Sequence, residues 1–224
     1  MIPIKDENPT RIFPFVTILI IIINVVIFFV ELQEGSNLET FVKSFGCIPY
    51  EITTGIDITP YIHFPVRFTI ITSMFLHGGW MHLIGNMFYL WIFGNNIEDK
   101  LGHMRYLIFY FVVGIIASLS QTMISPISKI PQIGASGAIS GILGAYLLLF
   151  PRAKVLLLLY FISIVKVPAY IILGLWILLQ VFNAFSTLSY AAHGGVAFFA
   201  HVGGFIAGFS LIKVFLIGRR YQRW

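Results

Sequence analysis

The chain has 224 residues, of which 58% are apolar and only 10% are charged. A soluble domain carries roughly 25% charged residues. This composition, with a mean hydropathy of +0.91, therefore excludes disorder, coiled coils and most soluble folds and indicates a membrane protein. The formal net charge of +5 does not indicate a nucleic-acid partner, because the basic residues lie at the ends of apolar segments, as in membrane proteins.

Apolar segments long enough to cross a bilayer follow one another along the chain. A transmembrane helix needs about 20 mainly apolar residues, and five segments meet this length: 12–31, 78–97, 104–124, 168–187 and 194–216. Residues 136–150 form a shorter sixth segment rich in small residues, which we expect at the centre of the bundle. The sequence therefore predicts an all-α polytopic membrane protein, with six transmembrane helices and a short fourth helix, folded as one domain over residues 1–224.

Two apolar stretches are not predicted to cross the membrane. Residues 155–165 are too few to span it, and we expect them to lie at the interface. The loop 32–77 is long for a connector, so we expect it to be structured at the outer surface.

The basic residues predict the orientation. With six spans, 11 of the 14 Lys and Arg residues fall on the side of the two termini, and three lie on the opposite side: Lys43, Arg67 and Lys129. This bias predicts that both termini are cytoplasmic. We expect a plasma membrane, because no organelle presequence is recognisable, and Asp6 and Glu7 before the first span argue against a secretory signal.

Polar side chains inside a span are costly and are functional candidates by default. No acidic or basic residue lies in a span interior, and the polar candidates are His82, Asn86, Ser118, Ser120, Ser136, Ser140, Gln180, His201 and Ser210. His82 and Asn86 are four residues apart and share one helix face. Taken alone, they could be a hydrogen-bonded pair between helices.

Ser136 and His201 lie in segments rich in small residues. Ser136, in GASGA, starts the short span, where unpaired backbone N–H groups suit an oxyanion. By itself, a serine there is more often a helix cap. His201 lies in AHVGGFIAG, whose Gly204 and Gly208 allow another helix to come close. A structural histidine bound to a carbonyl is an equally common role.

Depth brings these candidates together. At about 1.5 Å per residue, His82, Asn86 and His201 lie roughly 6 to 12 Å below the outer end of their spans, and Ser136 falls in the same layer. A serine, a histidine and two further donors at one depth predict a nucleophilic site. Because no carboxylate lies in a span, we expect a Ser–His dyad, with the imidazole held by a group that the sequence does not identify.

These motifs together resemble the rhomboid family of intramembrane serine proteases. The resemblance covers residues 67–208 and includes TSMFLHGGWMHLIGNM, NIEDKLGHMR, GASGAISGILGAY, FPRAKV and AHVGGFIAG. It implies a serine-type endopeptidase that cuts transmembrane segments of other membrane proteins. It implies no cofactor or metal, and no partner beyond these substrates and the lipid bilayer.

The resemblance also implies roles for individual residues. Ser136 is similar to the family's nucleophile and His201 to its general base. An oxyanion hole is implied for His82, Asn86 and the backbone N–H of Ser136, and close approach to substrate for Gly134. The span 168–187 and the loop 188–193 resemble the family's proposed substrate gate. Glu98 and Arg105 are expected to fix the turn between the second and third spans.

One position departs from the family pattern. Family members often have an aromatic residue four positions after the nucleophile, stacked on the base, whereas this chain has Ser140 there. His77 and His193 lie near the predicted site, and minor roles are open for them. A zinc site from these two with His82 and His201 is conceivable, but it would leave Ser136 unexplained.

Two other function classes remain as alternatives. Non-catalytic rhomboid-like proteins bind clients without cutting them, but they lack one or both dyad residues. A small-solute channel would carry polar groups across the whole membrane, whereas these groups stop in the outer half.

Overall fold

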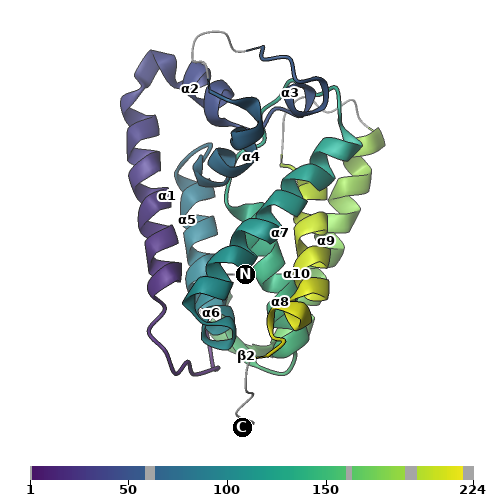
Figure 1. Ribbon diagram of the computed structural model, residues 1–224. Helices are drawn as coiled ribbons and strands as arrows, with labels where there is room; N and C mark the ends of the chain where they lie inside the picture. Colours follow the sequence, from purple (N-terminus) through teal and green to yellow (C-terminus); the bar gives the residue numbers. More distant parts are fainter. Residues whose placement is uncertain (1, 59–63, 160–162, 190–195, 219–224) are drawn as a thin grey trace.

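The computed structural model describes residues 2–58, 64–159, 163–189 and 196–218. The fold is mostly helical, with α1 and α9 at opposite sides of the bundle (Figure 1). Four helices are long and apolar enough to cross a membrane: α1 (Phe15–Gln33), α7 (His103–Ile124), α9 (Ala169–Ser189) and α10 (Phe198–Phe215). They match four of the predicted spans, with ends that differ by a few residues.

The other two predicted spans have a different form. The predicted span 78–97 is a helical stretch from Trp80 to Leu101 in three parts: α5 (Trp80–Tyr89), the π-helical η4 (Leu90–Gly94) and α6 (Asn95–Leu101). The predicted span 136–150 is α8 (Ser136–Leu149), whose 14 residues extend over about 20 Å. All residues from Ala138 to Tyr146 are buried, so α8 lies inside the bundle.

The all-α prediction omitted a small sheet. Strands β1 (Ile2–Asp6), β2 (Lys154–Leu159) and β3 (Ser163–Pro168) form an antiparallel sheet in that order. The segment 155–165, predicted as a single interfacial stretch, therefore contributes to two strands. Val155 and Leu157 are buried while their neighbours are not, a period of two that an unbroken run of apolar residues conceals.

The loop 32–77 is structured, as predicted. It contains the short helices α2 (Leu38–Phe45), α3 (Pro49–Thr54) and α4 (Thr69–Thr72), with 3₁₀ turns η1 (Gly35–Asn37), η2 (Val66–Phe68) and η3 (Ser73–Phe75). These helices lie at the end of the bundle opposite β2 (Figure 1). Residues 59–63 of this loop, including His63, lie outside the described residues.

Glu98 and Arg105 bind helix ends. The buried Glu98 carboxylate accepts hydrogen bonds from the backbone N–H groups of Val16 and Thr17 at 2.8 Å, in the first turn of α1. Arg105 donates to the carbonyl oxygens of Phe215 and Ile217 at the end of α10. Both positions suit the helix dipole. Glu98 also bonds Nδ1 of His103 at 2.6 Å, where α7 begins, so it joins the turn between the second and third spans to α1.

The helices α8 and α10 approach until backbone meets backbone. A Cβ atom added to Gly208 of α10 would overlap the carbonyl group of Gly141 in α8, and one added to Gly144 would overlap the carbonyl of Phe205. Small residues allow this approach where apolar association alone provides little force between membrane helices.

Replacing Gly208 with alanine should therefore separate α8 from α10. We expect Gly208→Ala to destabilise the fold by about 1–3 kcal/mol, because the added methyl group has no space. Gly174→Ala is the matched control, since nothing lies within 4 Å of its added Cβ. Melting temperatures in detergent measure both. An unchanged melting temperature for Gly208→Ala would contradict the close contact.

Candidate active site

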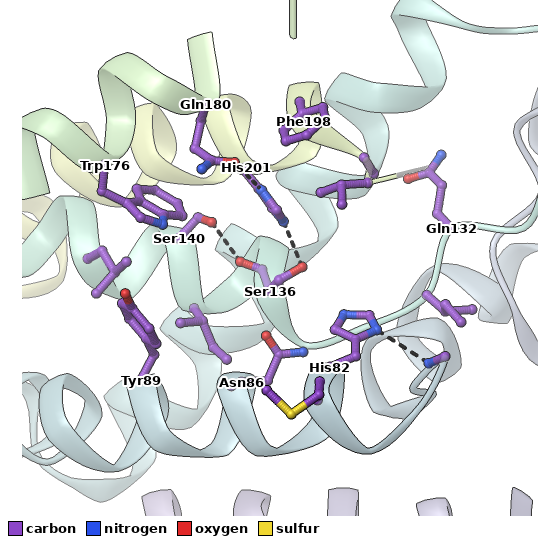
Figure 2. A pocket seen from close by; sticks show the side chains of 18 of the residues that line it. His82, Asn86, Tyr89, Gln132, Ser136, Ser140, Trp176, Gln180, Phe198 and His201 are labelled. Carbon is purple, nitrogen blue, oxygen red and sulfur yellow. Dashed lines mark hydrogen bonds between the residues drawn. The ribbon is translucent and has the colours of Figure 1, made fainter. Parts of the chain in front are cut away.

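Ser136 and His201 meet across the contact between α8 and α10. Ser136 is the first residue of α8, following Ala135 at the N-cap. Its Oγ lies 2.8 Å from Nε2 of His201, which is 8% exposed (Figure 2). The hydroxyl therefore bonds a side chain of another helix instead of capping its own helix.

The other ring nitrogen of His201 bonds to α9. Nδ1 lies 2.8 Å from Oε1 of Gln180. A carbonyl oxygen can only accept, so Nδ1 carries the proton and donates it. In the neutral ring, Nε2 then presents a lone pair to the Ser136 hydroxyl. An imidazole that accepts a hydrogen bond from a hydroxyl in this way has the geometry of a general base beside a nucleophile.

An aromatic side chain lies beside His201 despite the serine at position 140. The ring centroid of Trp176, on α9, is 6.0 Å from that of His201, with 35° between the planes. The Ser140 hydroxyl instead donates to the backbone carbonyl of Ser136 at 2.6 Å. The aromatic neighbour that the sequence lacks on α8 thus comes from α9.

His82 and Asn86 face Ser136 and His201 from α5 (Figure 2). The Gly78 N–H donates to Nδ1 of His82 at 3.3 Å, so Nε2 of a neutral ring carries the proton. Nδ2 of Asn86 donates to Nε2 of His77 at 3.0 Å, which leaves its second N–H available. Each side chain therefore has one N–H donor not used in these bonds.

His77 and Glu31 hold this face in place. The backbone N–H of His77 donates to the Glu31 carboxylate, with 3.0 Å to Oε1. Glu31 belongs to α1 and is buried. Glu31 thus lies in the last turn of α1, which continues to Gln33, two residues beyond the predicted end of the span. His77 lies before α5, and burial, with a smaller effect from His82, lowers its pKa to about 4. It is thus neutral near pH 7 and can accept the Asn86 hydrogen bond.

Gly134 lies against the α5 donors. Its φ of +116° is in the left-handed region, and an added Cβ would be 2.6 Å from Nε2 of His82. Its N–H donates to the Ser73 carbonyl at 2.8 Å, and the nearby Gln132 exchanges backbone hydrogen bonds with Cys47. The loop before Ser136 is therefore attached to the segment 32–77, and its glycine leaves room for the His82 ring.

Ser136, His201, His82 and Asn86 all line one cavity of about 810 Å³. Its lining includes the following polar side chains: His82, Asn86, Gln132, Ser136, Gln180 and His201. Its size is within the usual range for ligand pockets. A serine hydroxyl, an imidazole and two further N–H donors thus line one cavity.

Comparison with known proteins identifies the family. The Rhomboid domain model matches residues 66–218, about two thirds of the chain. The chain belongs to the rhomboid family. Ser136, His201, His82, Asn86 and Gly134 all lie inside the matched region. With four helices long enough to cross a membrane, this rhomboid protein is a multi-pass membrane protein.

Several curated rhomboid proteins are similar in sequence. RHOMBOID-like protein 5 of Arabidopsis thaliana is 35% identical over 69% of this chain and 46% of its own length. Rhomboid protein 1, mitochondrial, of Saccharomyces cerevisiae is 32% identical over 63% of this chain and 40% of its own length. Rhomboid protease GluP of Bacillus subtilis is 35% identical over 60% of this chain and 24% of its own length. The chain thus spans less than half the length of these relatives.

The remaining candidates lie elsewhere or have other partners. Ser120 bonds the Ile116 carbonyl in its own helix, and Ser118 bonds Gln132. His103 bonds Glu98. Within the described ranges, no group of three or more His, Cys, Asp or Glu side chains is arranged to hold a metal ion. His193, part of the conceivable zinc site, lies outside the described residues.

Two residues of this rhomboid site were missed by sequence reasoning. Gln180 was among the intramembrane polar residues but had no role assigned. Its position four residues after Trp176 placed both on one face of α9. Glu31 is the last residue of the predicted span 12–31, and its position in the sequence does not indicate a partner. Only the three-dimensional structure reveals that it bonds the backbone before α5.

The lowered pKa of His77 predicts a loss of stability in acid. The unfolded chain takes up a proton near pH 6.5, the ordinary histidine value, whereas folded His77 does so only near pH 4. Stability present above pH 6.5 is therefore lost as the pH falls toward 4, by up to about 3 kcal/mol. In detergent, His77→Gln should show a smaller decrease in melting temperature between pH 7 and pH 5 than the wild type. Equal decreases would contradict the prediction.

Proposed function

We propose that this rhomboid protein is an intramembrane serine endopeptidase that hydrolyses peptide bonds in or near transmembrane segments of other membrane proteins. The observation that carries the proposal is the 2.8 Å hydrogen bond between Ser136 Oγ and His201 Nε2, beside a cavity with further donors. Membership of a family that includes named proteases supports it.

The reaction begins at the Ser136 hydroxyl. Oγ attacks the scissile carbonyl carbon while Nε2 of His201 takes the hydroxyl proton. The imidazolium then gives this proton to the leaving amine, and an acyl-enzyme remains on Ser136. Water, activated by the same imidazole, hydrolyses the ester and restores the dyad.

The tetrahedral oxyanion is stabilised by donors that are already in place. The backbone N–H of Ser136 stands at the start of α8, where the helix leaves it unpaired. His82 offers Nε2–H, and Asn86 offers the amide N–H that His77 does not use. Donors fixed before the reaction stabilise developing charge without reorganising.

The substrate must present an accessible backbone carbonyl. Helical hydrogen bonds protect the peptide groups of a transmembrane segment, so part of the segment must unwind before attack. Segments weakened by glycine or proline are favoured for this reason. The small residues around Ser136 favour a small side chain before the cut, and Gly134 permits close approach of the substrate backbone.

The proposal extends to the membrane arrangement. Six spans are formed by α1, the stretch 80–101, α7, α8, α9 and α10, in one domain over residues 1–224. The distribution of basic residues supports cytoplasmic termini in a plasma membrane, with the cavity open to the outer face. We assign substrate entry to α9, the least buried candidate span at 17%, against 33–39% for the others. Of the gate loop 188–193, residues 190–193 lie outside the described residues.

A fluorophosphonate probe tests the nucleophile. We expect the purified protein to be labelled on Ser136 and to cleave a model transmembrane substrate, and we expect Ser136→Ala to do neither. Labelling or cleavage that persists in Ser136→Ala would refute the proposal. A folded wild-type protein that is neither labelled nor active would favour a non-catalytic, client-binding rhomboid.

The oxyanion donors are tested in the same cleavage assay. Asn86→Ala should lower turnover by roughly 10- to 1000-fold, because the oxyanion loses one of its donors. Ser120→Ala is a suitable control, because its hydroxyl bonds the Ile116 carbonyl within its own helix. An unchanged turnover for Asn86→Ala would give this residue a purely structural role.

The orientation is tested with reporter fusions in a bacterial host. A fluorescent protein fused to the C-terminus should fold and fluoresce, because it stays in the cytoplasm, and alkaline phosphatase at the same position should be inactive. The opposite pattern would contradict the proposed topology.

A further inference from the structure

The most informative unassigned group is the amide of Gln180, on α9. Of the hydrogen bonds among the described residues, one reaches each ring nitrogen of His201: Ser136 at Nε2 and Gln180 at Nδ1, both at 2.8 Å. Phe198 contributes an aromatic ring nearly perpendicular to the His201 ring, with centroids 6.2 Å apart, and no polar group. The amide of Gln180 is thus the polar group that decides which nitrogen carries the proton.

The chemistry of the amide suits a buried imidazole. Without an acceptor at Nδ1, the ring could place its proton on Nε2, and Ser136 would then face a donor instead of a base. A carboxylate could also hold Nδ1–H, but it would bury a charge at rest. The neutral carbonyl fixes the tautomer without that cost. Its dipole also stabilises the imidazolium that forms during attack.

The face of the ring is supported by the same helix. Trp176 lies one turn before Gln180 and contacts both His201 and Phe205, with ring centroids 6.0 and 6.2 Å apart. Ser140 of α8 lines the same cavity as Trp176, and its side chain is small. The edge and the face of the imidazole are therefore both supported from α9, a helix with few fully buried side chains.

We propose that Gln180 is a positioning residue of the dyad, which holds His201 in the Nδ1–H tautomer and makes its use as a base depend on α9 lying against α10. The proposal rests on the proposed protease function. It adds that a displacement of α9 which admits a substrate also releases the base, so attack follows only after α9 has returned. Substrate entry and chemistry are then separate in time.

Three variants separate positioning from packing. Gln180→Met keeps the length of the side chain and removes the acceptor, whereas Gln180→Glu restores an acceptor oxygen. Leu178→Met, at an exposed position on the same helix, is the matched control. We expect Gln180→Met to lower kcat roughly 10- to 1000-fold, because an unfixed tautomer disables the base. KM should change by less than about threefold, Gln180→Glu should recover most of the loss, and Leu178→Met should match the wild type.

A spectroscopic measurement tests the same claim without requiring activity. Nitrogen NMR of protein labelled at histidine reports the tautomer, and the His201 signal is assigned by its loss in His201→Asn. The wild type and Gln180→Glu should show protonated Nδ1, and Gln180→Met a mixture of tautomers. This measurement remains decisive even if the protein cleaves nothing, so failure of the protease proposal is distinguishable.

Several results would overturn the inference. Gln180→Met could cleave as fast as the wild type. Gln180→Glu could be as slow as Gln180→Met, which would indicate a packing defect. The tautomer of His201 could also be the same in Gln180→Met and the wild type. Each of these outcomes would show that Gln180 does not position the base.

Discussion

The site depends on the contact between α8 and α10, in which glycine places backbone against backbone. Gly144 of α8 and Gly208 of α10 occupy positions where any side chain would overlap the backbone of the opposite helix. Ser136 lies at the start of α8 and His201 in the first turns of α10, so this contact sets their separation before any side chain is considered. The 2.8 Å hydrogen bond follows from how closely the two helices approach.

The remaining groups are attached to this pair by separate polar links. Glu31 of α1 holds the backbone of His77, and His77 holds Asn86, so the last turn of α1 takes part in orienting the Asn86 amide. The Gly134 N–H donates to the Ser73 carbonyl, which connects the loop before Ser136 with the segment 32–77. At the opposite end, Glu98 binds the first turn of α1. The helix that supplies Glu31 is thus fixed at both ends.

Much of this site could be predicted from the sequence because its signals are local. A histidine and an asparagine four residues apart must share a helix face, and glycines spaced four apart indicate close packing. Gln180 and Glu31 escaped because their roles depend on partners 21 and 46 residues away, and no periodicity encodes such pairings. The sheet escaped for a different reason: Leu156 to Leu159 are all leucine, which hides the alternation of a strand.

The burial of α9 has a consequence for how the protein behaves outside its native surroundings. Only 17% of the α9 span is buried, so lipid or detergent surrounds most of this helix. In contrast, α8 is surrounded almost entirely by protein. Extraction from the membrane should therefore affect the two hydrogen-bond partners of His201, Ser136 on α8 and Gln180 on α9, to different extents. We therefore expect the contact of His201 with Gln180 to respond more to the thickness and fluidity of the surrounding medium than the contact of His201 with Ser136.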